Sequence, residues 1–324
     1  MKAARLVAPQ KFEFIDVPEP VTDVGFAKIK VEAVSVCGSD IHSSYHAPLP
    51  EEAYPLAPGV PCHEIAGTIV ESRSPELKEG QRAIVIPTRG QGGLVEYITQ
   101  EPLRIIPVPD YGLIEDWVMC QHTGTVLYSA KHWGNPAGKR IAVLGQGGIG
   151  LSFAMIAERQ GADQIIGIDK LDYRLKKSLE LGATHTVNPD REDLYSTLDE
   201  ITKGEGVDIV VDASGNNDGF ETCINIVKPH GTFINFSLTG PIKERTSFVH
   251  AEWMVKACTI IPTQIARTNQ PTKEIREMVA LKDRGWLDPA VLKTHKLDFN
   301  DVQQAYDMYA NYKNDVIKVA MSLS

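Results

Sequence analysis

The segment from 141 to 150 constrains the fold more than any other part of the chain. The apolar run Ile141–Leu144 continues directly into the glycine-rich run Gly145–Gly150, and an apolar-periodic stretch follows. A predicted strand that ends in a glycine-rich turn at the start of a helix is the setting of a dinucleotide fingerprint. The glycines give a pyrophosphate room to approach, and the helix N-terminus offers it free N–H groups. The segment predicts an α/β domain that binds a dinucleotide.

The residues after the next predicted strand indicate which dinucleotide binds. The predicted strand Gln164–Asp169 ends in an acid at roughly the separation at which this fold binds the adenosine ribose hydroxyls. A carboxylate there repels a 2′-phosphate, which favours NAD over NADP. The neighbouring Lys170 and Arg174 keep NADP as an alternative, and a solvated strand end is the other interpretation of Asp169. The predicted cofactor-binding residues are Gly145, Gly147, Gly148, Ile149, Gly150, Asp169, Arg174 and Gly215.

The two parts of the sequence differ in their predicted secondary structure. Residues 1 to about 110 contain short β-rich runs broken by Gly and Pro, which predict an irregular β domain that opens with a strand pair in Met1–Val17. From residue 139 strand and helix patterns alternate, which predicts a parallel sheet. Near the C-terminus we expect a helix from Asn300 to Ala310 and a last strand over Val316–Met321. A chain of 324 residues exceeds what one core usually fills, so we expect two domains.

Charge and composition exclude several classes of partner. The formal net charge is −9 and no dense Lys/Arg cluster occurs, so we expect neither a nucleic-acid nor a membrane partner. Met1–Val17 lacks the layout of a signal peptide, and we expect a cytoplasmic protein. The five cysteines are odd in number and widely spaced, which suits a thiolate metal site in a reducing compartment better than a disulfide framework.

Three clusters in the first 122 residues contain the side chains that a zinc site needs. Cys37 opens the run Cys-Gly-Ser-Asp-Ile-His, His63 and Glu64 are adjacent, and Cys120 follows a methionine. Thiolate, imidazole and carboxylate are the usual ligands of zinc. Each cluster alone is a weak signal, because a lone Cys is most often a small buried hydrophobe and a His-Glu pair most often lies on the surface.

Together the clusters resemble the zinc-dependent medium-chain dehydrogenase/reductase family. The run Cys37–His42 is similar to the segment that presents the first zinc ligand in that family, and Pro61–Gly67 is similar to the segment that presents the second. Cys120 precedes the glycine run by about the interval at which the family places its last protein ligand. The resemblance covers essentially the whole chain.

This resemblance implies a fold and an assembly. It implies a six-stranded, doubly wound Rossmann sheet in residues 116–264, and a discontinuous, β-rich, GroES-like catalytic domain formed by residues 1–115 and 265–324. It also implies a homodimer or homotetramer.

The resemblance further implies roles for individual residues. Cys37, His63 and Cys120 would be zinc ligands, and Glu64 would be a ligand or lie just behind the metal. Ser39 would receive the substrate proton, and His42 would pass it outward through the cofactor ribose. The predicted catalytic residues are Ser39, His42 and Glu64, and the predicted metal ligands are Cys37, His63, Glu64 and Cys120.

The sequence also departs from the pattern of the family. The four-cysteine structural zinc lobe is absent, since the segment Gly80–Ile86 continues directly to Gly93, and we therefore expect one Zn²⁺ per chain. Cys62 replaces a usual glycine before His63. Gln121 and His122 lie next to Cys120 and compete with it as the last ligand.

These features together predict an enzyme. We expect a zinc-dependent oxidoreductase that transfers a hydride between a small secondary alcohol or polyol, or the matching ketone, and NAD(H). One alternative is a metal-free quinone or enone reductase of the same superfamily. Another is a nucleotide-binding protein without turnover, because a fold does not dictate a function. The identity of the substrate stays open.

Overall fold

The computed structural model describes residues 1–47, 49–238 and 245–323. The chain forms two compact units. The first combines Met1–Gly124 with the chain from Asn269 onward, and the second is Thr125–Thr268. The domain boundaries predicted at 115/116 and 264/265 lie nine and four residues before these divisions. Among the described residues, no helix combines the length and the apolar character needed to cross a bilayer.

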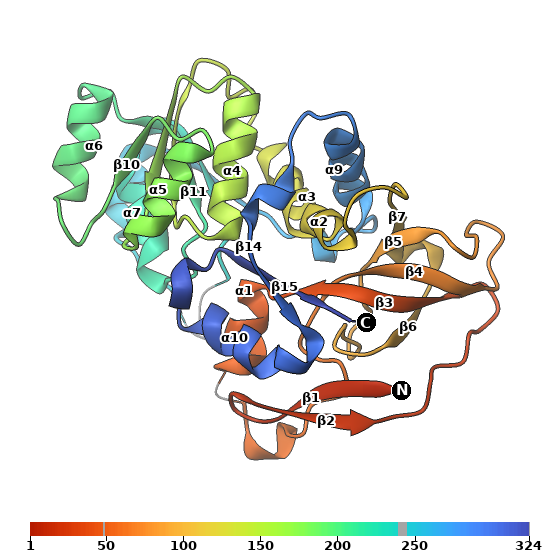
Figure 1. Ribbon diagram of the computed structural model, residues 1–324. Coiled ribbons are helices and arrows are strands. Elements are labelled where there is room, and N and C mark those ends of the chain that lie inside the picture. The colour runs from red at the N-terminus through yellow and green to blue at the C-terminus, as the bar shows by residue number, and fades with distance from the viewer. Residues whose placement is uncertain (48, 239–244, 324) are drawn as a thin grey trace. The chain divides into compact units, whose positions relative to one another are not determined.

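The first unit is built around a seven-stranded sheet whose strands run in the order β14-β15-β3-β4-β5-β7, with β6 paired to β3 (Figure 1). The predicted strand pair in Met1–Val17 is confirmed as the antiparallel hairpin β1-β2. The strands of this unit are β1 (Lys2–Ala8), β2 (Lys11–Asp16), β3 (Ala27–Ser35), β4 (Glu64–Ser72), β5 (Arg82–Val85), β6 (Tyr97–Gln100), β7 (Ile105–Pro107), β14 (Lys293–Asp298) and β15 (Lys318–Ser322).

Short helices accompany this sheet. They are α1 (Gly38–Asp40), the π-helix Ile41–Tyr45, α2 (Ile114–Trp117), α3 (Met119–Ala130), α9 (Lys273–Asp283) and α10 (Val302–Ala310), and α3 continues into the second unit. The helix predicted from Asn300 begins two residues later, because the side chain of Asp298 caps a 3-10 turn, Phe299–Asp301, that precedes it. Val302 and Tyr306 on this helix are buried in the core.

The second unit confirms the predicted doubly wound parallel sheet. Its strands run in the order β10-β9-β8-β11-β12-β13, which is the order of a Rossmann fold. The strands are β8 (Arg140–Leu144), β9 (Gln164–Ile168), β10 (His185–Val187), β11 (Val207–Asp212), β12 (Val227–Asn235) and β13 (Thr259–Pro262).

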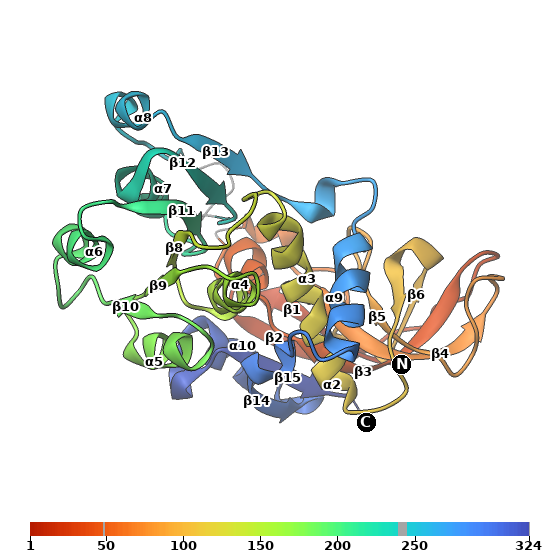
Figure 2. The same cartoon turned by 90° about the horizontal axis from the view of Figure 1, so that it is seen from above.

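Helices cover both faces of this sheet. In Figure 2, α4 and α5 lie on one side of the sheet, and α6, α7 and α8 lie on the other. The helices are α4 (Gly148–Arg159), α5 (Asp172–Glu180), α6 (Leu194–Thr202), α7 (Asn217–Ile226) and α8 (His250–Lys256). Because every strand is parallel, the loops at the carboxyl ends of β8, β9 and β11 lie at one edge of the sheet, where this fold binds its ligands.

Candidate metal centre and dinucleotide site

Antiparallel pairing of β3 and β4 brings the first two sequence clusters together. Ser35, the last residue of β3, pairs with Glu64, the first residue of β4. Cys37 lies two residues beyond the end of β3, and His63 directly precedes β4. Two segments separated by about 25 residues in the sequence therefore meet at the same end of the sheet.

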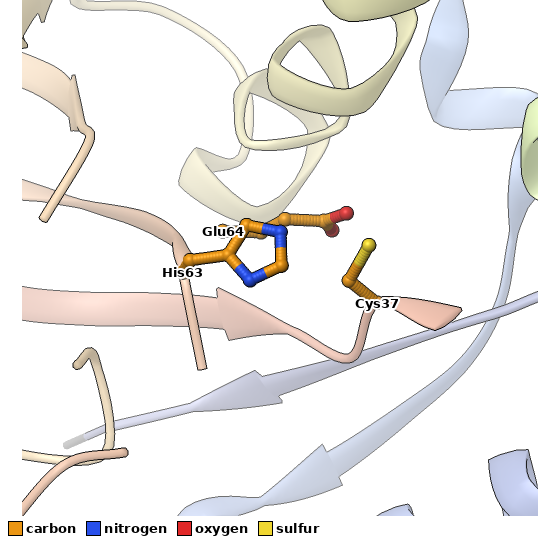
Figure 3. A group of neighbouring side chains, drawn as sticks. All are labelled: Cys37, His63 and Glu64. Atoms are coloured by element: carbon orange, nitrogen blue, oxygen red, sulfur yellow. The ribbon is translucent and has the colours of Figure 1, made fainter. Parts of the chain in front are cut away.

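Cys37, His63 and Glu64 form a group that can hold a metal ion. One ligand atom from each residue lies within 4.8 Å of the others. Figure 3 shows the thiol of Cys37 and the carboxylate of Glu64 converging beside the ring of His63. Glu64 is fully buried, and its Oε1 atom has no hydrogen-bond partner among the described residues. Because an unpaired buried carboxylate oxygen is costly, this donor set fits a bound cation such as Zn²⁺.

Asp40 holds two of these residues in place, and the sequence analysis missed it. Its Oδ1 atom lies 2.7 Å from Nδ1 of His63, and its Oδ2 atom accepts the backbone N–H of Cys37 at 3.1 Å. The bond to Nδ1 leaves Nε2 of His63 available to a metal. Asp40 lies three residues after Cys37, which is the spacing of a capping box, and this spacing could have revealed it.

A buried ion pair fixes the orientation of Glu64. Lys318 on β15 donates from Nζ to Oε2 of Glu64 at 2.6 Å and to the backbone oxygen of Val36 at 2.7 Å. Burial opposes ionisation of Glu64, but the charges of Lys318, His122 and His63 and the hydrogen bond from Lys318 together outweigh burial and lower the pKa of the carboxyl group. Glu64 is therefore ionised, with Oε2 engaged by Lys318 and Oε1 unpaired.

The predicted proton-relay residues follow Cys37 in the chain. Ser39 in α1 donates from Oγ to the sulfur of Cys37 at 3.3 Å, and its Oγ lies 3.5 Å from Nε2 of His63. A hydroxyl in this position can exchange a proton with a ligand bound at the group. His42 is the second residue of the π-helix Ile41–Tyr45 and is exposed.

Cys120 does not belong to the group that the structure brings together. It is buried in α3, and burial raises the pKa of its thiol to about 12, while Lys282 acts in the opposite direction. Residues two apart on a helix point in different directions, and His122 is the residue of α3 that interacts with Glu64 and Lys318. Burial, with the charge of Lys318, lowers the pKa of His122 to about 3.

Replacing Asp40 with Asn lowers the affinity for zinc by about 10–100-fold, because the ring of His63 loses its charged partner. The affinity is measured by competition with a chromophoric chelator. Asp16→Asn, at an exposed position on β2, is the matched control and leaves the affinity unchanged. Equal affinities in the two variants would show that Asp40 does not support the metal centre.

The glycine turn between β8 and α4 has the shape that a dinucleotide requires. Gly145 adopts φ +90°, a conformation that other residues rarely take. A Cβ atom at Gly150 would lie 1.7 Å from the backbone oxygen of Gly145, so only glycine lets the helix approach the strand this closely. Gly148 and Ile149 open α4, and their position at its N-terminus suits an anion.

Asp169 and Arg174 lie beside this turn. Asp169 accepts the backbone N–H groups of Gln146 at 2.7 Å and Leu171 at 2.9 Å, and an Nη1 atom of Arg174 lies 3.6 Å from its Oδ2. Lys170, one of the two basic residues that kept NADP as an alternative cofactor, forms an ion pair with the exposed Asp190. Gly215, three residues after the end of β11, donates its backbone N–H to Oγ of Ser237 at 2.7 Å. The structure therefore places all eight predicted residues in loops or helix starts at one edge of the sheet.

Comparisons with known proteins identify the family of this chain. The model of the alcohol dehydrogenase GroES-like domain matches residues 24–110, and the model of the zinc-binding dehydrogenase matches residues 148–283. An uncharacterised zinc-type alcohol dehydrogenase-like protein of Haemophilus influenzae is 30% identical over 76% of this chain and 78% of its own length. The chain belongs to the zinc-binding medium-chain dehydrogenase family. The predicted family and the predicted GroES-like and Rossmann folds are confirmed.

Two further comparisons are with a sorbitol dehydrogenase and with a solved structure that contains NADH. Sorbitol dehydrogenase 1 of Saccharomyces cerevisiae is 26% identical over 92% of this chain and 91% of its own length. An alcohol dehydrogenase from Escherichia coli CFT073, whose crystal structure contains NADH, superposes with a TM-score of 0.86 at 20% identity and covers 100% of this chain and 99% of its own. The latter likeness shows the fold alone. This dehydrogenase is thus an oxidoreductase of the zinc-type alcohol and polyol dehydrogenase group.

Proposed function

We propose that this dehydrogenase uses one zinc ion and NAD to oxidise a secondary alcohol or polyol, or to reduce the matching ketone. The convergence of Cys37, His63 and Glu64 within 4.8 Å is the observation that carries the proposal. We assign these three residues as ligands and propose His122 rather than Cys120 as the fourth, because the buried His122 lies close enough to Glu64 and Lys318 to interact with their charges. Neither His122 nor Cys120 belongs to the group of three donor atoms itself. The first unit is then the catalytic domain and the second binds NAD.

The residues around this group supply the acid–base chemistry. When bound, zinc supplies a Lewis acid that lowers the pKa of an alcohol, and NAD supplies the hydride acceptor. Ser39, 3.3 Å from the sulfur of Cys37, accepts the hydroxyl proton of the substrate, and His42 passes it outward. Asp40 and Lys318 hold His63 and Glu64 in position throughout.

The proposal is tested by supplying a panel of secondary alcohols and polyols, sorbitol among them, with NAD and following the formation of NADH. We expect turnover of at least one polyol or secondary alcohol, and loss of that turnover in Ser39→Ala. Reduction of quinones or enones by protein without zinc would favour the metal-free reductase instead. A protein that contains zinc and binds NADH but oxidises no member of the panel would contradict the proposal.

Replacing Asp169 with Ala weakens the binding of NAD about tenfold and reduces the preference for NAD over NADP, because the carboxylate both accepts the ribose hydroxyls and repels a 2′-phosphate. The dissociation constants of NADH and NADPH are measured by fluorescence titration. Asp163→Ala, at an exposed position before β9, is the control. If both constants stayed unchanged, Asp169 would have no part in binding the ribose.

We also propose that this dehydrogenase assembles as a homo-oligomer through its second unit. β13 lies at the edge of the parallel sheet, and α8 next to it exposes Met254 by 64% and Val255 by 75%. Exposed apolar residues beside an unpaired strand edge are typical of an interface between subunits. Size-exclusion chromatography with light scattering measures the mass of the protein in solution. The mass of a dimer or tetramer would support this proposal, and the mass of a monomer would contradict it.

A further inference from the structure

The side chain of Gln146 is a buried polar clamp inside the glycine turn. It is fully buried, and its amide nitrogen donates to the backbone oxygen of Val143 at 2.7 Å and to that of Gly145 at 3.1 Å. Its Oε1 atom accepts the hydroxyl of Ser178, on α5, at 2.8 Å. One side chain thus links the end of β8, the turn itself and the helix that follows β9.

The neighbouring strand makes room for this clamp. A Cβ atom at Gly167, on β9, would lie 2.5 Å from Oγ of Ser178 and 3.1 Å from the side-chain amide of Gln146. A larger residue at Gly167 would therefore displace both partners. The hydrogen bond between Gln146 and Ser178 passes over β9 in the space that the glycine leaves.

The backbone of Gln146 connects the same residue to Asp169. Its N–H group donates to Oδ2 of Asp169 at 2.7 Å. The side chain of Gln146 therefore fixes the turn, and its backbone fixes the carboxylate. These are the two features of the second unit that a dinucleotide contacts through its pyrophosphate and its adenosine ribose.

We propose that Gln146 and Ser178 are positioning residues for the dinucleotide. This proposal rests on the proposed NAD-linked function. A run with four glycines in six residues has many accessible backbone conformations, and ordering it on binding costs affinity. The clamp holds the turn in its binding conformation before the ligand arrives. Its three hydrogen-bonded partners are the backbone oxygens of Val143 and Gly145 and the hydroxyl of Ser178, so the side chain uses none of the backbone N–H groups that the turn and the start of α4 offer to a pyrophosphate.

The test compares three variants by the dissociation constant of NADH and by the midpoint of thermal unfolding. Gln146→Met keeps the length of the side chain and removes its hydrogen bonds, and Ser178→Ala removes only the bond to Oε1. Thr202→Val is the control, because Thr202, on α6, is equally buried and its hydroxyl makes two hydrogen bonds away from the turn. All constants are measured well below the unfolding midpoint of each variant.

We expect the dissociation constant of NADH to rise about tenfold in Gln146→Met and about threefold in Ser178→Ala, and the double variant to bind no more weakly than Gln146→Met, since the two residues act as a unit. Thr202→Val lowers the midpoint and leaves the constant unchanged. If Gln146→Met does not fold, Ser178→Ala decides alone. Variants that unfold earlier but bind NADH as the wild type does would overturn the inference, whereas a wild type that binds no NADH would overturn the proposed function.

Discussion

Replacing Lys318 with Met lowers the free energy of unfolding of the metal-free protein by about 3–5 kcal/mol. The change leaves Glu64 fully buried without the partner that lies 2.6 Å away, and an uncompensated buried charge is strongly destabilising. Met fits the space of the lysine stem, so the loss reflects charge rather than a cavity. Unfolding in denaturant, after removal of metal with a chelator, measures the effect.

Two comparisons separate this effect from a general loss of ion pairs. Adding Glu64→Leu to Lys318→Met restores much of the stability, because no charge is then left in the core. Lys28→Met is the matched control: Lys28 makes ion pairs with Glu19 and Glu71, both half exposed, and we expect little change. A loss of stability in Lys318→Met no larger than in Lys28→Met would contradict the buried ion pair.

Replacing Cys37 with Ala abolishes high-affinity zinc binding and alcohol oxidation, whereas replacing Cys120 with Ala leaves both intact. The thiol of Cys37 lies in the group of three donor atoms, and the thiol of Cys120 does not. We expect the affinity for zinc to fall by about three orders of magnitude or more in Cys37→Ala, since loss of one of four ligands is costly. Cys62→Ala, which removes a buried thiol next to His63, is the control for packing.

Zinc content and affinity are measured in each variant after purification without added metal. Zinc lost from Cys120→Ala and retained by Cys37→Ala would reverse the assignment of the ligands. Loss from both would indicate that Cys120 reaches the metal in a conformation that differs from this one. The variant His122→Ala completes the series, and we expect it to bind zinc more weakly than Cys120→Ala does.

Local sequence patterns predicted much of the fold and the dinucleotide site. The strand, glycine turn and helix around Gly145 are contiguous in the sequence, so their chemistry and geometry can be predicted from one short window. The strand pair β1-β2 and the alternation of strand and helix after residue 139 are equally local. Resemblance to the family supplied the roles of Cys37, which follows β3, and His63, which precedes β4.

Contacts between distant segments limited the prediction of the metal centre. Lys318 is separated from Glu64 by 254 positions, and its one sequence signal was a charged residue inside an otherwise apolar predicted strand. The choice between Cys120 and His122 depends on the rotation of α3 about its axis, which spacing along the chain does not determine. Asp40 was missed although it lies within the run Cys37–His42, three residues after Cys37, at the spacing of a capping box.

The zinc content of the wild-type protein, measured by elemental mass spectrometry after purification without added metal, tests the central claim most directly. The account predicts about one zinc per chain, because a single group of thiolate, imidazole and carboxylate ligands occurs in the part of the chain that the structure describes. Removal of that zinc should also lower the unfolding temperature. A folded protein that binds NADH and contains no zinc would contradict the account.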